Sequence, residues 1–355
     1  MKKLGIFVDS LKRDGAERVS VNLANYMINQ SIEVTIITEW ISENEYDIPE
    51  GIKRISINSK GKKYLKYLYN VLKMRKALVE NGVDTLLVMD VPACLIAIPA
   101  SRGIGIKVVV SERNDPVHFP GKRIVAKVSR WLMSKADGFV FQTVDAKEFY
   151  YKICKGRGVI IPNPLFIKTL PIAYTGEREK IIVSAGRLTK QKNQKLLIDA
   201  FCKFNDKVKG YELWIYGEGI LKNDLIQYTY DRGIADLVNF PGNKVDLLER
   251  IKKATMFVMT SNFEGMPNAL LEAMAIGLPV VSSDCPCGGP RAVIDQNING
   301  VLFDVGDSSE CANAMIKIAL NKTLAKNIAN NALNIRKQLD SELISKKWKE
   351  YLENL

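Results

Sequence analysis

The chain is 355 residues long, 47% hydrophobic and 25% charged, which is typical of a globular protein with room for two domains. Its six cysteines have no framework spacing, and with a single histidine they exclude a disulfide scaffold and form no zinc pattern. The net charge of +12 is uneven, because residues 1–170 hold 27 lysines and arginines against 17 acidic residues, whereas residues 171–355 hold 24 against 22. We therefore expect the N-terminal half to face something anionic: a membrane surface, a nucleic acid or a phosphorylated substrate.

Short runs rich in β-branched residues alternate with helical patterns along the whole chain. In the first half, strands are predicted at residues 3–9, 33–39, 84–90, 106–112, 138–143 and 158–163. In the second half they are predicted at residues 180–186, 212–219, 238–242, 256–261, 278–284 and 300–304. Continuous apolar strands separated by helices are typical of parallel sheets covered on both faces. The sequence therefore predicts an α/β protein with two doubly wound, Rossmann-like domains, and ligands at the carboxyl ends of the strands.

The boundaries of these domains follow from composition. We place the N-terminal domain at residues 1–165 and the C-terminal domain at residues 172–339. The segment 161–180 is rich in proline and has no helical period, so it is the expected linker. The tail, residues 340–355, has the pattern of a terminal helix that joins the first domain.

Two glutamates bracket seven residues in "NFEGMPNALLEAMAIGLPVV", residues 262–281. Pro267 suits the first position of a helix that Gly277 and Pro279 end. This helix is almost wholly apolar and should be buried, yet it carries Glu272, and an unpaired buried carboxylate is costly. Glu272 therefore needs a partner, which is either a ligand hydroxyl or a core arginine.

Glu264 precedes this helix, in the loop that follows the strand at 256–261. That place is the ligand-binding edge of a parallel sheet. The backbone amides at Met266, Asn268 and Ala269 point out of the helix N-terminus, where the helix dipole favours a phosphate.

Arg187 and Lys192 lie in a loop that enters a helix predicted at residues 193–204. Arginine offers a planar fork for phosphate oxygens, and lysine a mobile point charge. Alone, this pair could belong to a solvated loop. Together with a helix N-terminus and two carboxylates in the same domain, it describes a site for a nucleotide sugar.

Gly15 begins a helix, residues 15–30, that follows the first strand. A loop and a helix N-terminus at this place can hold an anion or let a substrate approach closely, although a plain turn fits the sequence as well. The "YGEG" turn at 216–219 has the composition of a structural turn.

Several of these motifs together resemble glycosyltransferase family 4, the retaining transferases of the GT-B fold, whose two Rossmann-like domains face a central cleft. The resemblance is carried by "GRLTKQKN", "YGEG", "NFPG", the Glu264-x7-Glu272 block and "DGAERVSVNLANYM" near the start of the chain. "SERNDP" (111–116) and "CPCGGPR" (285–291) resemble a subset of bacterial transferases that build capsule, O-antigen or related surface glycans.

The resemblance implies a role for each matching residue. Arg187 and Lys192 would hold the donor diphosphate, and Glu272 the ribose hydroxyls. Glu264 would lie near the transferred sugar, so that Glu264, Arg187 and Lys192 form the catalytic group. The other donor-binding positions implied are Gly15, Gly242, Asn243, Lys244, Val245, Gly265, Met266, Pro267, Asn268 and Ala269.

Two departures from the family pattern concern the first domain. The paired glycine of the family is Asp14-Gly15 here, so its first glycine is missing. Where many members have a histidine after "SE", this chain has Arg113, and its only histidine is His118. We assign Arg113 and His118 to the acceptor side.

The expected reaction transfers an α-linked hexose or N-acetylhexosamine from a nucleotide sugar, with UDP favoured over GDP, to a saccharide acceptor with retention. The two domains should close over the donor and exclude water. Because the chain contains no Asp-x-Asp, we expect no metal and no cofactor.

An epimerase or phosphorylase of the same fold is the alternative enzyme. A basic membrane- or nucleic-acid-binding protein is the non-enzymatic alternative, although no nucleic-acid recognition motif is present.

Two basic, amphipathic segments give the N-terminal charge a candidate cause. Residues 60–76 place Leu65, Leu68 and Leu72 on one stripe, and residues 121–135 carry Trp131 and Leu132 among basic residues. Such stripes lie either on an anionic membrane surface or against the core of the domain. The first possibility fits an acceptor linked to polyprenyl diphosphate and an enzyme that is cytoplasmic and peripheral on the inner face of the cell membrane. No signal peptide is predicted, and the apolar run at 91–100 is too short to cross a bilayer.

Overall fold

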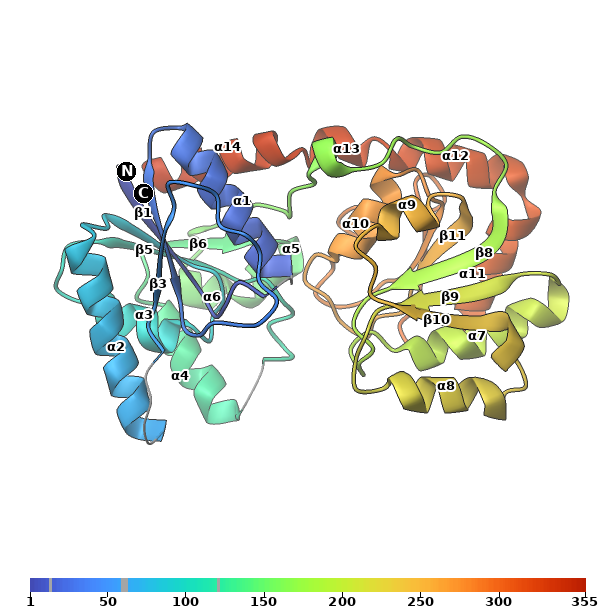
Figure 1. Cartoon of the computed structure of the whole chain (residues 1–355), viewed down its shortest axis with the longest axis horizontal. Helices are drawn as coiled ribbons and strands as arrows, with labels where there is room; N and C mark the ends of the chain where they lie inside the picture. The colour runs from blue at the N-terminus through green and yellow to red at the C-terminus, as the bar shows by residue number, and fades with distance from the viewer. Residues whose placement is uncertain (13–14, 59–62, 120–121) are drawn as a thin grey trace. The chain divides into compact units, whose positions relative to one another are not determined.

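The computed structural model describes residues 1–12, 15–58, 63–119 and 122–355. The chain divides into two compact units, one formed by residues 1–164 with 342–355 and the other by residues 165–341 (Figure 1). Each unit is built around its own parallel sheet.

The sheet of the N-terminal unit has the strand order β3-β2-β1-β4-β5-β6-β7. Its strands are β1 (Lys3–Val8), β2 (Glu33–Thr38), β3 (Lys53–Ser56), β4 (Thr85–Val88), β5 (Lys107–Ser111), β6 (Gly138–Phe141) and β7 (Gly158–Ile160). The central strand β1 pairs in parallel with β2 on one side and with β4 on the other. Because every side chain of β4 and β6 is buried, these strands need helices on both faces of the sheet.

Helices cover both faces of this sheet. They are α1 (Gly15–Asn29), α2 (Lys63–Glu80), α3 (Cys94–Ser101), α4 (Arg123–Met133), α5 (Val144–Phe149) and α6 (Tyr151–Cys154). Helices α2, α3 and α4 lie side by side on one face, whereas α1 packs on β1 and β2 from the other (Figure 1). Within the described ranges, no helix is both long enough and apolar enough to cross a bilayer.

The last helix, α14 (Ser341–Glu353), completes the N-terminal unit. The indole of Trp348 is buried, and the Tyr351 hydroxyl accepts a hydrogen bond from the Phe139 amide at 2.8 Å and donates one to its carbonyl at 3.2 Å. The end of the chain is therefore bound to β6, more than 200 residues earlier.

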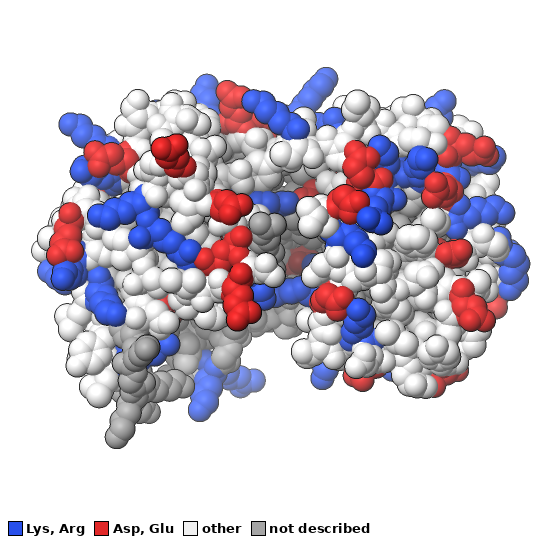
Figure 2. All heavy atoms as spheres, viewed as in Figure 1, with Lys and Arg blue, Asp and Glu red and all other residues white. Residues whose placement is uncertain are grey.

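The sheet of the C-terminal unit has the order β10-β9-β8-β11-β12-β13. Its strands are β8 (Glu179–Ala185), β9 (Glu212–Tyr216), β10 (Val238–Gly242), β11 (Ala254–Met259), β12 (Val280–Ser283) and β13 (Val301–Phe303). The helices of this unit are α7 (Gln194–Lys207), α8 (Lys222–Asp231), α9 (Leu247–Ile251), α10 (Asn268–Ala275), α11 (Ser308–Leu320), α12 (Lys322–Ala332) and α13 (Ile335–Gln338), with short 3-10 turns η1 (Ile167–Thr169) and η2 (Ala235–Leu237). Helices α7 and α11 pack against each other over a core that includes Phe201, Ile215 and Met315. On the face shown in Figure 2, basic and acidic side chains are interspersed over this unit.

The fold prediction is confirmed, since all twelve predicted strands are present and all pair in parallel. The prediction was incomplete at β3, a thirteenth strand that pairs with β2 at the edge of the first sheet. Both sheets have a switch point, between β1 and β4 in one and between β8 and β11 in the other, where successive connections leave in opposite directions. In open α/β sheets, ligands bind beside the carboxyl ends of the strands at such a point.

Candidate active site

The switch point of the C-terminal sheet is built from the loops that follow β8 (residues 187–193) and β11 (residues 260–264). The backbone amide of Asn262 donates to the Gln191 carbonyl at 2.7 Å, and the Gln191 side chain donates to the Phe263 carbonyl at 3.1 Å. Further side-chain bonds between the two loops join Thr260 to the carbonyls of Lys192 and Asn193, Asn262 to the carbonyl of Lys190, and Asn193 to Asn262. The two loops are therefore held as one body.

This joining brings Lys192 to Glu264. Nζ of Lys192 lies 2.5 Å from Oε1 of Glu264, and the Ser261 hydroxyl donates to the same oxygen at 2.8 Å. Glu264 is only 7% exposed, and the lysine side chain is also largely buried. A buried charge is tolerated when it is paired and hydrogen-bonded, and both conditions are met here. The structure thus unites two of the three predicted catalytic residues.

Arg187, the third predicted catalytic residue, stands at the start of the same loop. Its carbonyl accepts a hydrogen bond from the Gln194 side chain at 3.0 Å, which ties the loop to the first turn of α7. Its own side chain is exposed, and in the described part of the chain it forms no ion pair. Arg187 therefore shares a loop with Lys192 but does not take part in the ion pair between Lys192 and Glu264.

Helix α10 follows the Glu264 loop and begins one residue later than predicted. Pro267 is the cap residue, with φ −79° and ψ 104°, and Asn268 is the first helical residue. A proline fits at the cap as well as at the first position, because neither needs an amide donor within the helix. The prediction of a buried helix is confirmed for Leu270, Leu271 and Met274, whereas Glu272 is half-buried.

The segment "CPCGG", residues 285–289, packs against the Glu264 loop and is hydrogen-bonded to it. The sequence did not predict this role. The Glu264 amide donates to the Pro286 carbonyl at 2.6 Å, and the Cys287 amide donates to the Glu264 carbonyl at 2.9 Å. A Cβ atom on Gly289 would lie 1.8 Å from the Gly265 carbonyl oxygen, so only glycine fits there. Burial raises the pKa of the Cys285 thiol to about 12, which keeps it protonated and unreactive at neutral pH.

The predicted donor-binding residues 242–245 lie at the end of β10 and in the exposed loop that follows it, and Gly242 is the buried last residue of the strand. Gly242 has a φ of +76°, and a Cβ atom there would meet Glu218 Oε1 at 2.6 Å. Asn243 and Lys244 are exposed, and Val245 is 100% exposed. The neighbouring "YGEG" turn is structural, as predicted, because a Cβ atom on its first glycine would lie 2.0 Å from the Gly186 carbonyl oxygen.

The remaining predicted residues lie in the N-terminal unit. Gly15 is the first residue of α1, while Arg113 and His118 follow β5. His118 Nδ1 lies 2.5 Å from Asp115 Oδ2, and Arg113 donates to Asn163 Oδ1. The predicted site residues are thus divided between the two units. Most of those predicted to bind the sugar donor lie in the C-terminal unit.

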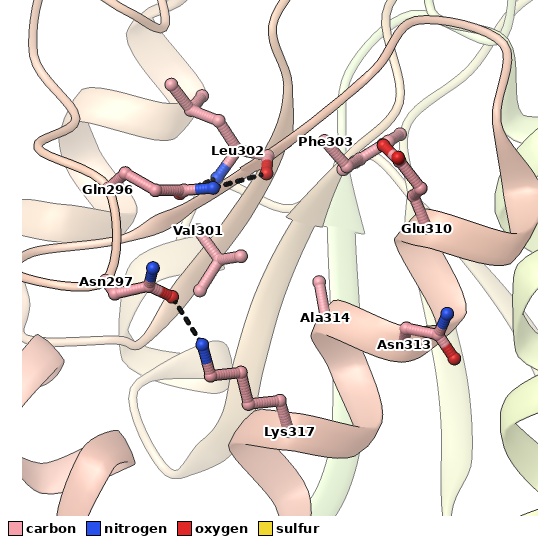
Figure 3. A pocket seen from close by; sticks show the side chains of 9 residues that line it. All are labelled: Gln296, Asn297, Val301, Leu302, Phe303, Glu310, Asn313, Ala314 and Lys317. Atoms are coloured by element: carbon pink, nitrogen blue, oxygen red, sulfur yellow. Dashed lines mark hydrogen bonds between the residues drawn. The ribbon is translucent and has the colours of Figure 1, made fainter.

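A separate cavity of about 320 Å³ lies along the edge strand β13. Figure 3 shows Lys317 of α11 bound to Asn297, and the Gln296 side chain bound to the backbone of Leu302. None of the predicted site residues lines this cavity. It is therefore distinct from the switch-point site.

Comparison with known proteins identifies the family and agrees with the fold. Residues 13–165 match the sequence model described as Glycosyltransferase Family 4, and residues 172–335 match the one described as Glycosyl transferases group 1. The 4-alpha-N-acetylgalactosaminyltransferase of Campylobacter jejuni that acts on N-acetylgalactosamine-N,N'-diacetylbacillosaminyl-diphospho-undecaprenol is 27% identical over 99% of this chain and 100% of its own. The Escherichia coli UDP-Gal:alpha-D-GlcNAc-diphosphoundecaprenol alpha-1,3-galactosyltransferase is 26% identical over 92% of each chain. The structure of Anabaena HepE in complex with UDP and glucose superposes with a TM-score of 0.84 over all of both chains, at 18% identity.

The two parallel-sheet units and their likeness to solved structures define the GT-B fold, and the sequence models together with the named relatives identify an enzyme of the glycosyltransferase class. The non-enzymatic alternative is thereby set aside. Since the two sequence models cover nearly all of the residues between them, the chain belongs to glycosyltransferase family 4.

Proposed function

We propose that this transferase moves an α-linked hexose or N-acetylhexosamine from a UDP-sugar to a saccharide linked to polyprenyl diphosphate, with retention of configuration. The product would be a bacterial surface glycan of the O-antigen, lipopolysaccharide or capsule type. The observation that carries the proposal is the Lys192–Glu264 pair, held at the switch point by two interlocked loops.

The donor diphosphate would lie against Lys192, Arg187 and the N-terminus of α10. Arg187 is exposed and available to bind an anion, and the first amides of α10 have no acceptor within the helix. These groups would stabilise the charge that grows on the departing diphosphate, which is commonly the largest catalytic contribution. They supply the positive charge that a bridging metal would otherwise bring, so we expect activity without metal or cofactor.

In the transfer step, the bond between the anomeric carbon and the diphosphate oxygen breaks on the same face as the acceptor oxygen attacks. The new glycosidic bond forms from the acceptor hydroxyl, whose proton passes to the leaving diphosphate. Glu264 would orient the sugar by accepting hydrogen bonds from its hydroxyls, and Glu272 would accept hydrogen bonds from the ribose. No protein nucleophile is required in this step.

The choice of donor and acceptor rests on the relatives. The E. coli relative is named for UDP-galactose, and HepE is described with UDP and glucose. The names of the Campylobacter jejuni and Escherichia coli relatives both specify saccharides linked to undecaprenyl diphosphate as acceptors. This chemistry favours a UDP donor and a lipid-linked acceptor here.

An exposed amphipathic surface on the N-terminal unit supports access to such a lipid. We define it as Leu65, Leu68 and Leu72 on α2 with Ile124, Val128 and Trp131 on α4, all of them exposed. The alternative that the α2 leucines contact the core is wrong, because Met74, Ala77 and Leu78 fill that role. Basic residues surround the surface, and Lys135 Nζ lies 5.3 Å from the centre of the Trp131 ring. Apolar side chains rimmed by cations are typical of binding to an anionic membrane, which would place the enzyme on the inner face of the cell membrane.

The test is a donor screen with the purified enzyme and a pool of lipid-linked saccharides, read by mass spectrometry with and without EDTA. We expect one UDP-sugar to be consumed, an α-linked product by NMR, and equal rates in both conditions. Release of free sugar phosphate or an epimerised nucleotide sugar, without glycosidic product, would support a phosphorylase or an epimerase instead.

A further inference from the structure

The loop after β5 contains Arg113, and only one of the two terminal nitrogens of its guanidinium group forms a hydrogen bond among the described residues. Arg113 Nη2 donates to Asn163 Oδ1, which follows β7, and the Gln142 side chain, which follows β6, donates to the same oxygen at 2.5 Å. Gln142 and Asn163 are both buried. The guanidinium is therefore fixed at the carboxyl edge of the N-terminal sheet, where ligands of such sheets bind.

The other terminal nitrogen of this guanidinium, Nη1, is buried and has no hydrogen-bond partner among the residues that the structure describes. Burial lowers the pKa of Arg113 to about 10, so the group still carries its charge at neutral pH. An unpaired donor on a buried cation is costly, typically more so than on a neutral group. Arg113 as a whole is half-buried, so part of the residue reaches the surface of this edge.

The neighbouring carboxylate does not supply the missing partner. Glu112 Oε1 accepts the backbone amides of Arg113 and Asn114 at 3.0 and 3.1 Å, and Oε2 accepts the Tyr150 hydroxyl at 2.7 Å. Glu112 therefore uses its oxygens on other donors. The charge of Glu112 acts on Arg113 and opposes the lowering of its pKa by burial, but among the described residues Glu112 accepts no hydrogen bond from the guanidinium.

We propose that Nη1 of Arg113 binds a phosphoryl oxygen of a diphosphate ester. The inference rests on the proposed function, in which donor and acceptor both carry a diphosphate. A planar guanidinium with one terminal nitrogen bound to Asn163 and the other without a hydrogen-bond partner suits a phosphate oxygen. The ester is either the acceptor lipid diphosphate or the donor diphosphate, and the two sources are separated by experiment.

The test compares Arg113→Gln and Arg113→Lys with Arg102→Gln, a control that removes one exposed arginine from the same unit. Calorimetry gives the Kd of each protein for UDP and, separately, for a short polyprenyl diphosphate. We expect Arg113→Gln to weaken one of these ligands by on the order of tenfold or more, since hydrogen bonds to charged groups have this strength. Arg113→Lys, which keeps the charge and loses the fork, should fall in between, and Arg102→Gln should match the wild type.

The ligand that weakens identifies the source of the phosphate. If both Kd values of folded Arg113→Gln and Arg113→Lys stay within twofold of the wild type, the proposal is overturned. If Arg113→Gln does not fold, Arg113→Lys alone decides. Failure of the proposed function is a different result: wild-type enzyme that binds both ligands but transfers no sugar would overturn the reaction and leave the Arg113 assignment standing.

Discussion

Lys192 and Glu264 are 72 residues apart in the chain, yet Nζ of the lysine lies 2.5 Å from Oε1 of the glutamate. Each follows a different strand, and the contact exists because β8 and β11 are neighbours in the sheet. The pair holds both side chains in place before any substrate arrives, which is the preorganisation that electrostatic catalysis needs.

Replacing Lys192 should lower turnover, and because it leaves buried Glu264 without its charge partner, kinetics are compared only on folded protein. We expect Lys192→Ala to lower kcat by about 100- to 1,000-fold, the usual effect of removing one group that stabilises developing charge. Lys190→Ala, an exposed lysine in the same loop, is the control and should keep wild-type kcat. Steady-state kinetics with the donor found in the screen make the comparison, and equal kcat in the two variants would contradict the assigned role.

Glu272 should act on donor affinity. Glu272→Ala removes the carboxylate assigned to the ribose hydroxyls, so we expect the donor KM to rise roughly tenfold with a smaller change in kcat. Glu177→Gln, an exposed glutamate of the same unit, serves as the control. A fall in kcat without any change in KM would instead place Glu272 at the reacting centre.

Gly289 should be required for stability and activity, because its backbone packs directly against the carbonyl of Gly265. In Gly289→Ala the new Cβ atom would lie 1.8 Å from the Gly265 carbonyl oxygen, so the Glu264 loop must shift. We expect a loss of roughly 1–3 kcal/mol in the free energy of unfolding, together with a large loss of activity. Gly176→Ala is the control, since its Cβ atom would meet only the hydroxyl end of the half-buried Tyr174 side chain. Full activity in Gly289→Ala would show that the loop position is not critical.

The buried carboxyl group of Asp90 should destabilise the N-terminal unit increasingly as pH rises. Burial, and after it the charge of Glu112, raises the pKa of Asp90 well above its ordinary value of 3.8. A carboxyl group whose pKa is raised on folding favours the folded state at low pH, and this contribution is lost as pH rises through the folded pKa. We therefore expect Asp90→Asn to have the same Tm as the wild type near pH 4 and a higher one at neutral pH. Glu43→Gln, an exposed acid, should follow the wild type at every pH, and parallel curves for Asp90→Asn would contradict the prediction.

Membrane binding should depend on the amphipathic surface. Leu68 is 53% exposed and Trp131 61% exposed, and burying a large apolar side chain contributes about 1.5–3 kcal/mol. The double variant Leu68→Ser/Trp131→Ser should therefore bind vesicles that contain phosphatidylglycerol at least tenfold more weakly, by about that arithmetic. Ile172→Ser, which removes an 87% exposed side chain from the other unit, is the control. Vesicle binding that is equal in both variants would assign the attraction to the cations alone.

The sequence predicted most of the framework because buried parallel strands have a strong apolar signal. Strand β3 escaped prediction because it is short, lies at the sheet edge and carries Lys53 and Arg54, and Arg54 forms an ion pair with Glu45 instead of entering the core. Helix α2 could not be oriented from its pattern, since it has apolar residues on its buried side and on its exposed side. Which stripe faces the sheet is decided by packing.

The sequence singled out the charged residues of the candidate site, of which the structure joins Lys192 to Glu264, but not the residues that hold these side chains in place. Glu272 was singled out as a charge in an apolar helix, Glu264 by its place in the loop after a strand, and Arg187 with Lys192 as a basic pair in a loop that enters a helix. Ser261 and Thr260 gave no signal, because a hydroxyl in a loop has no expected partner until the fold brings one. The close approach of Gly289 to Gly265 could not be predicted for the same reason, since it joins two loops that are far apart in sequence.

The attachment of α14 to β6 has a consequence for biosynthesis. Helix α14 carries a buried tryptophan and packs on the unit that the first residues begin, so that unit cannot be completed before α14 has been synthesised. The C-terminal unit, residues 165–341, has no such dependence on the tail. The unit whose residues are translated first is thus expected to finish folding after residues 165–341, which lie between its two parts in the chain.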